Sequence, residues 1–373
     1  MVAVERALSL PTLLSAALVA FTVEFDNEFE HRTPHRTTTG GGAGADRPWL
    51  VSQVMWSNVM QYVDDDGIEV GDLHVRARTT KDSLGGLERW GYVTVQPPGR
   101  RGSAAPDPGA TVHATAAGQR AQKVWRPLAG EIEARWEERF GADAVRAVRD
   151  SLVAVADRTG LDAPDYVPIV YPTLNGRAEL PPVLPAGTPR SGPTASRSDL
   201  SVLLSHVIMA FTVDYERQSR ISLPIGATLL PVLDDVGVRQ RDLPGRSGVS
   251  KEAVAMAVGF LVRRGCAVQA PDPGAPRGKV VLLTPKGVGA LAKHRRLLRS
   301  TEEAWEERFG RRRVQAVRAA LSPLVGEAPS AERSPLFGGL EPYPDGWRAR
   351  VGRPDTLPHY PMVLHRGGFP DGS

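Results

Sequence analysis

The sequence predicts a mainly α-helical fold with small β-hairpins, in which one structural unit is written twice. Two internal matches carry this prediction. Residues 10–25 and 200–215 are identical at eight of sixteen positions, and the string WEERFG recurs at residues 136–141 and 305–310. Between these matches, segments of helical periodicity and short β-like runs follow in the same order in both halves. Such self-similarity between the two halves of a chain indicates a repeated architecture.

The chain has 373 residues, of which 41% are hydrophobic, so it is long enough for two or three domains with a core in each half. Its formal net charge of +4 and pI of about 9.3 permit an anionic partner such as nucleic acid without requiring one. The single cysteine, Cys266, excludes an internal disulfide and is typical of a reducing compartment. Its place beside a β-like run favours an inert buried thiol over a redox sensor.

The apolar segment at residues 7–23 has the composition of a signal-peptide core, but its recurrence at residue 200 favours a packing helix. Both copies run directly into charged residues. No apolar run reaches the roughly 18 residues expected of a membrane span. We therefore expect a cytoplasmic protein that has no association with a membrane.

The two units are expected at residues 1–175 and 200–326. The first contains a Gly- and Thr-rich loop insertion at residues 31–49, which the second lacks. Residues 176–199 hold five prolines and predict a stiff, extended linker between the units. Residues 327–373 are expected to form a Pro- and Gly-rich C-terminal tail.

Each unit is expected to contain two helices, a short helix, a capped helix, a β-hairpin and a long C-terminal helix. Ser250 precedes an apolar-periodic run and is the expected N-cap of the capped helix in the second unit. The corresponding helix of the first unit is four residues shorter and contains Gly85 and Gly86, which weaken it. The long helix of each unit is expected to run on through WEERFG. One face of the second capped helix is predicted to hold Val254, Ala257, Val258 and Leu261.

A short helix, a capped helix and a hairpin in this order are typical of a winged helix-turn-helix. The stretch GVRQRDLPGRSGVSKEAVAMAVGFLVRRG at residues 237–265, together with KVVLLTPKG at 279–287, resembles the MarR family of bacterial transcription regulators. In the first half the match is weaker, and HATAAG at 113–118 stands in for the LTPKG motif. Regulators of this family are homodimers in which each subunit places one recognition helix in the major groove.

The resemblance implies that two winged helix-turn-helix units and their packing helices form an intrachain pseudo-dimer. A physical argument points the same way, because the helix at residues 200–215 is too apolar to remain on a surface and a second copy is available in the same chain. Pairing within one chain also replaces a concentration-dependent step. We therefore expect a monomer with an internal pseudo-two-fold axis.

A DNA-binding role requires polar or basic side chains at the start of the recognition helix and on the hairpin. Among the outward positions at the start of the second recognition helix, only Lys251 is basic. On the hairpin, Asp272 with Arg277 approximates the Asp–Arg pair of the family's wing. The candidate DNA-binding residues are Arg78, Thr79, Thr80, Lys81, Arg100, Arg101, Arg246, Ser250, Lys251, Arg277 and Lys279.

Other conspicuous residues have simpler interpretations. Trp136 and Trp305, in the repeated WEERFG strings, are expected to pack in the core. His206 lies on an apolar helix and is expected to be an interface histidine, with a ligand contact as the alternative. No catalytic motif, phosphate loop or metal-ligand spacing is found, so we expect neither an enzyme nor a bound cofactor or metal.

The predicted function is therefore that of a transcription regulator that binds duplex DNA through two unequal winged helices. Its response to a small-molecule effector is implied by the resemblance only. Because the two halves are unequal, we expect an asymmetric DNA site. The alternative is a winged-helix scaffold that senses a ligand or binds a protein partner and has no DNA role.

Overall fold

The computed structural model describes residues 7–33, 59–77, 81–97, 107–161, 171–172, 178–179, 199–275, 277–344, 349 and 353–361. Within them the protein is mainly helical, with two three-stranded antiparallel sheets and one short two-stranded pairing. This confirms the predicted mainly α-helical class with small β-elements. Most of the predicted linker lies outside the described residues.

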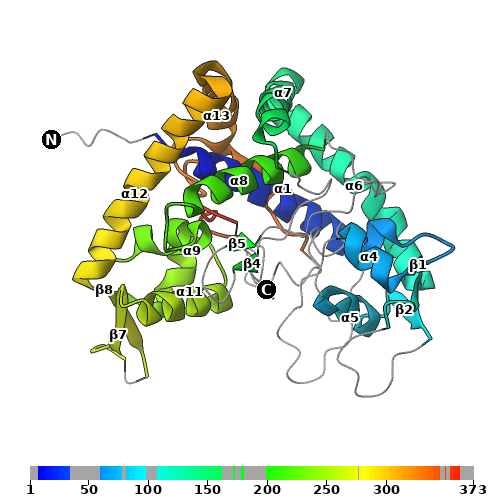
Figure 1. The fold of residues 1–373 in the computed structure, drawn as a ribbon, viewed down its shortest axis with the longest axis horizontal. Coiled ribbons are helices and arrows are strands. Elements are labelled where there is room, and N and C mark those ends of the chain that lie inside the picture. Colours follow the sequence, from blue (N-terminus) through cyan, green and yellow to red (C-terminus); the bar gives the residue numbers. More distant parts are fainter. Residues whose placement is uncertain are drawn as a thin grey trace.

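In the first half, a long helix is followed by short elements, a small sheet and two further helices (Figure 1). The elements are α1 (Leu10–Arg32), the 3-10 turn η1 (Met60–Tyr62), β1 (Ile68–Glu69), α4 (Val70–Ala77), α5 (Lys81–Arg89), β2 (Val93–Gln96), β3 (Thr111–Ala114), α6 (Ala116–Phe140) and α7 (Ala142–Thr159). The strands β4 (Tyr171–Pro172) and β5 (Ala178–Glu179) then pair with each other.

The second half repeats this order with a few additions. Its elements are α8 (Leu200–Glu216), α9 (Leu223–Thr228), η2 (Leu230–Val232), β6 (Val238–Arg239), η3 (Gln240–Asp242), α10 (Leu243–Ser247), α11 (Lys251–Arg263), β7 (Ala267–Pro271), β8 (Lys279–Leu283), α12 (Pro285–Trp305), the π-helical η4 (Glu306–Gly310), α13 (Arg311–Val325) and η5 (Pro335–Gly339).

The helix after each hairpin begins in the same way in both halves. Thr115 and Thr284 are the N-caps of α6 and α12, and each hydroxyl accepts a hydrogen bond of 3.1 Å from the backbone N–H three residues later. Those N–H groups belong to Gly118 and Gly287, where an added Cβ would lie 2.1 Å from Tyr92 O and 1.9 Å from Cys266 O, respectively. Glycine is therefore required at this position, where the first turn of the helix contacts the backbone that leads into the preceding hairpin.

The long helices do not run through WEERFG as the periodicity predicts. α6 ends at Phe140 and is followed by Gly141, with φ of 91°, and η4 ends at Gly310, with φ of 92°. Glycine reaches such positive φ angles at little cost, so the chain turns there and α7 and α13 begin. α1 also continues to Arg32, past the predicted start of the loop insertion, because Arg32 pairs with Glu28 and Glu131.

The tryptophans of the two WEERFG strings make matching contacts. Trp136 Nε1 donates to Glu24 Oε1 at 3.0 Å, and Trp305 Nε1 donates to Asp214 Oδ2 at 2.9 Å. Both indoles are buried, with 0% and 1% exposed, which confirms the predicted core positions. The carboxylates also accept from an arginine three residues after each tryptophan, Arg139 or Arg308.

Aromatic rings complete the same arrangement in both halves. Phe21 of α1 packs edge-on against Trp136, with ring centroids 5.6 Å apart, and Phe211 of α8 packs likewise against Trp305 at 5.1 Å. Phe21 and Phe211 are corresponding residues of the internal match. The Trp, Arg and Gly of the repeated string therefore each have the same structural role in both halves.

Helices from both halves share one hydrophobic core. α1 packs against α8, and α7 packs against α13, so Phe21, Trp136, Phe211 and Trp305 belong to a single cluster. A second cluster is built from α9, η2, α10, α11 and the sheet β6–β8–β7, and the start of α12 packs against it. Figure 1 shows α7 and α13 at one end of the molecule, α1 and α8 crossing its centre, and α5 and α11 towards the opposite end.

The C-terminal segment is not a loose tail where the structure describes it. Leu336, Phe337, Leu357 and Tyr360 are buried in the shared core. Ser15 Oγ of α1 donates to Pro358 O at 2.9 Å. Of the described helices, none combines the length and apolarity that crossing a membrane requires.

Candidate nucleic-acid interface

A tight turn joins α10 to α11. Gly248 ends α10 in the left-handed conformation, with φ of 72°, and its N–H donates to Pro244 O at 2.9 Å. Two residues later, Ser250 caps α11 by accepting from Ala253 N at 3.1 Å. Val249 between them is buried. The turn therefore fixes the angle at which α11 leaves α10.

One face of α11 is buried and the other is exposed. The four residues predicted for the inner face, Val254, Ala257, Val258 and Leu261, are at most 1% exposed. Lys251, Glu252 and Ala255 point outward. Ser250 does not, because its side chain is 2% exposed and its hydroxyl caps the helix. The Ser250 side chain therefore serves as the helix cap, and a DNA contact at this residue stays a prediction.

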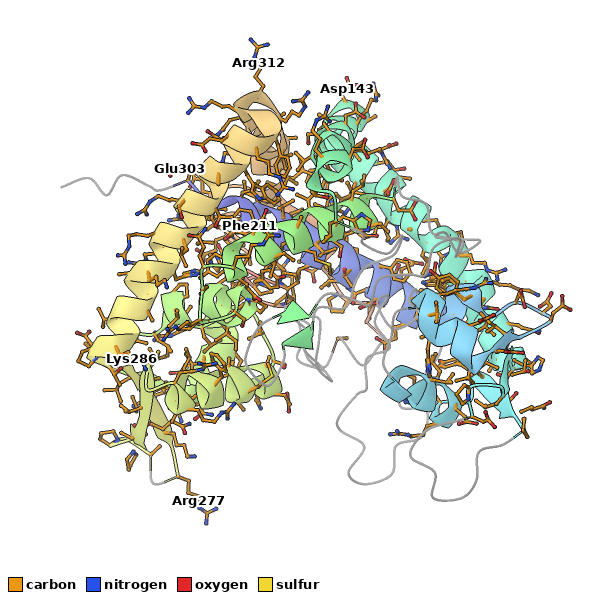
Figure 2. All side chains as sticks on the ribbon, viewed as in Figure 1. Asp143, Phe211, Arg277, Lys286, Glu303 and Arg312 are labelled. Atoms are coloured by element: carbon orange, nitrogen blue, oxygen red, sulfur yellow. The ribbon has the colours of Figure 1, made fainter. Side chains whose placement is uncertain are left out.

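The β7–β8 hairpin extends beyond α11 and carries exposed basic residues. Figure 2 shows Arg277 at its far end, pointing away from the molecule. Arg277 and Lys279 are exposed and make no ion pair with any described residue. Arg246, on α10, is exposed as well. Four of the candidate residues thus lie in the second half with accessible cationic groups, namely Arg246, Lys251, Arg277 and Lys279.

The predicted Asp272–Arg277 pair is replaced by another. Asp272 Oδ2 lies 3.1 Å from Arg239 Nε, and its Oδ1 accepts from Gly274 N at 2.8 Å. Arg239 belongs to β6, which pairs with β8 through Val238 and Arg239. Sequence inspection missed this arginine because it did not predict that a short strand before α10 joins the hairpin. Asp272 therefore links the hairpin to β6 through its ion pair with Arg239, and Arg277 is available to contact another molecule.

Fewer of the candidate DNA-binding residues of the first half are described. Arg78, Thr79, Thr80, Arg100 and Arg101 lie outside the described residues. Lys81 begins α5, but its side chain is not described. α5 has 9 residues against 13 in α11, which confirms the predicted loss of about one turn. Its Leu84 and Leu87 are buried, so the shortened helix keeps an inner face.

The remaining conspicuous residues are buried or half-buried. His206 is half-buried on α8. Cys266 is buried, as predicted, and burial raises the pKa of its thiol. His294 of α12 is also buried, its Nδ1 lies 2.8 Å from Tyr215 Oη, and burial lowers its pKa to about 4. Among the described residues, no group of three His, Cys, Asp or Glu side chains is placed to hold a metal ion.

No protein-family model, curated protein or solved structure matches this chain. Function must therefore be inferred from geometry and charge.

Proposed function

We propose that the protein is a DNA-binding transcription regulator in which two unequal winged helix-turn-helix units, at residues 1–175 and 200–326, are joined in one chain. The observation that carries the proposal is the second unit, in which α10, a tight turn and the capped helix α11 precede a hairpin with two unpaired cationic side chains. This order resembles that of MarR-family regulators. Such a protein acts in the cytoplasm on duplex DNA.

The dimensions of α11 suit the major groove of DNA. Its 13 residues span about 20 Å. Its exposed side, beginning at Lys251, is opposite the buried face that attaches it to the module. In this mode the first residues of the helix approach base edges, and the hairpin places Arg277 and Lys279 against backbone phosphates. Phosphate contacts supply affinity, whereas sequence preference depends on the few side chains near Lys251.

The shared helical core takes the place of a dimer interface. The paired packing of α1 with α8 and of α7 with α13, and the matching tryptophan contacts, support two copies of one unit related by a pseudo-two-fold axis. α5 and α11 then face one duplex at positions roughly one helical turn apart. Because α5 is shorter, the two half-sites differ, and the DNA site is asymmetric.

A second candidate function is favoured by the composition of the exposed side of α11. Glu252, Ala255 and half-buried Met256 follow Lys251 there, and none of them is basic. A winged-helix scaffold that senses a ligand or binds a protein would tolerate this surface. A small-molecule effector, with His206 as a possible contact, rests on the family resemblance alone.

The test is binding of the purified protein to labelled duplex DNA, of random sequence and from its own upstream region, at several salt concentrations. We expect log affinity to fall linearly with log salt and the upstream fragment to be preferred. Arg277→Gln should weaken binding to all sequences and lower the salt slope by about 1, whereas Lys251→Ala should reduce the preference itself.

The control is Arg312→Gln, which removes the same charge from an exposed residue at the opposite end of the molecule (Figure 2). It should leave both affinity and slope unchanged. Absence of DNA binding at low salt would contradict the proposed DNA-binding function and favour the alternative of a winged-helix scaffold. A footprint centred on a perfect inverted repeat would contradict the unequal half-sites.

A further inference from the structure

One stretch of the second half concentrates positive charge. Between Asp272 and Glu302 the sequence contains seven Lys or Arg residues and no Asp or Glu. The whole chain has a formal net charge of +4, so this stretch is +7 and the rest is −3. The basic residues are Arg277, Lys279, Lys286, Lys293, Arg295, Arg296 and Arg299, and all are exposed.

Five of these residues belong to α12, which starts where the hairpin ends. Its inner side holds the buried residues Gly287, His294, Leu297, Thr301 and Trp305. Lys286, Lys293 and Arg296 are spaced by seven and three residues, which places them in one stripe along the helix. The stripe is about 15 Å long. Figure 2 shows Lys286 near the base of the hairpin and Arg277 at its tip, on the same edge of the molecule.

These charges are not neutralised within the described part of the chain. None of the five basic residues of α12 forms an ion pair there, and Lys286 donates only to Arg264 O, at 2.6 Å. Arg295 and Arg299 stand four residues apart, so they repel each other on the helix surface. Further along, the pattern changes, because Glu302 pairs with Arg318. The unpaired basic residues of α12 therefore extend from Lys286 to Arg299, on the hairpin side of Glu302.

We propose that the outer side of α12 is a second phosphate-binding surface, which holds the duplex that flanks the site contacted by the second winged unit. This inference rests on the proposed function. A duplex that leaves the hairpin at Arg277 and Lys279 meets Lys286 first, and neutralisation of the phosphates on that side bends it towards Arg296 and Arg299. The footprint is therefore longer on one side of the core site than on the other.

The first half offers a smaller version of this surface. Between Asp107 and Glu131 the sequence contains Arg120, Lys123 and Arg126, all in α6, and no Asp or Glu, so the charge of this stretch is +3. All three side chains are exposed. The difference between +7 and +3 predicts that flanking DNA stabilises the complex unequally on the two sides.

The experiment uses the full chain and a core duplex selected for binding from a random-sequence pool. The core is compared with duplexes extended by about 15 base pairs on one side or on the other. We expect one extension to raise affinity roughly tenfold at moderate salt and the other to have a much smaller effect. The triple variant Arg295→Gln/Arg296→Gln/Arg299→Gln should lose the larger gain and lower the salt slope on that extended duplex by about 2–3.

The matched control is Arg120→Gln/Lys123→Gln/Arg126→Gln, which removes three charges from α6 and should keep the larger gain. Thermal unfolding by circular dichroism confirms that both variants are folded. The phosphate-binding role of α12 would be overturned if the core duplex and both extended duplexes bound with equal affinity. It would also be overturned if the triple α12 variant kept the larger gain in affinity. Neither result would contradict the proposed function. If no duplex is selected from the pool, the proposed function and this inference both fall.

Discussion

Replacement of Trp136 or Trp305 by Phe tests whether the two halves form one core. Each indole N–H donates to a carboxylate, and a hydrogen bond to a charged group contributes about 1.5–3 kcal/mol. The smaller ring also leaves a void in a fully buried site. Because Glu24 is 3% exposed and Asp214 is 21% exposed, Trp136→Phe should cost more. We expect losses in the free energy of unfolding of about 3 kcal/mol at Trp136 and about 2 kcal/mol at Trp305.

The assay is urea unfolding followed by far-ultraviolet circular dichroism, which does not depend on tryptophan emission. Either substitution should shift the same cooperative transition, because both residues belong to one cluster. Trp125→Phe is the control, since Trp125 is 6% exposed in the same cluster and donates no hydrogen bond to a carboxylate among the described residues. A loss no larger than that of the control would refute the role of the carboxylates. The shared core would be refuted if unfolding took place in two separate transitions and each variant shifted only one of them.

Three further outcomes follow from single sites. Gly248→Ala should destabilise the protein by about 2 kcal/mol or more in chemical denaturation, because φ is 72° and the added Cβ would lie 2.5 Å from Thr356 O. The control Gly245→Ala, in open space on the same helix, should cause no loss of stability and a gain of up to about 1 kcal/mol. His294 has a folded pKa of about 4 against about 6.5 unfolded, so stability should be complete above pH 6.5 and fall by about 3 kcal/mol on acidification to pH 4. A His294→Gln variant measured by the same pH series should show a flatter dependence. Cys266 should react slowly with a thiol reagent in the native protein and rapidly in urea, since it is buried; fast native labelling would contradict the placement.

Local signals in the sequence predicted local structure well. Ser250 stands before an apolar run, and it caps α11 as expected. The apolar spacing of α11 predicted its buried face, and the missing residues of the first half predicted the short α5. These features depend on residues close in sequence, so a single chain contains the information needed to find them.

The breaks in the long helices were missed for a specific reason. Apolar periodicity continues on both sides of Gly141 and Gly310, whereas the turn is set by one residue with positive φ. A glycine inside a helical pattern is compatible with either outcome. Both WEERFG strings end in a glycine, and this repetition was the available signal for a turn.

Contacts between distant segments were the least predictable. The pairing of Arg239 with Asp272 joins a short strand to a hairpin tip, and Ser15 meets Pro358 across most of the chain. The proline-rich composition of the C-terminal segment is typical of a tail, yet Leu357 and Tyr360 fill the shared core. Neither composition nor periodicity records which surface such a segment covers.

The central claim is that a single chain holds one duplex through two unequal winged units. The most direct measurement is a titration of labelled duplex with protein well above the dissociation constant, combined with the mass of the complex from light scattering. The account predicts a break at one chain per duplex, a mass equal to the duplex plus one chain of 40.2 kDa, and dissociation by added salt. Two chains per duplex, a stable homodimer without DNA, or no salt-dependent complex would contradict it.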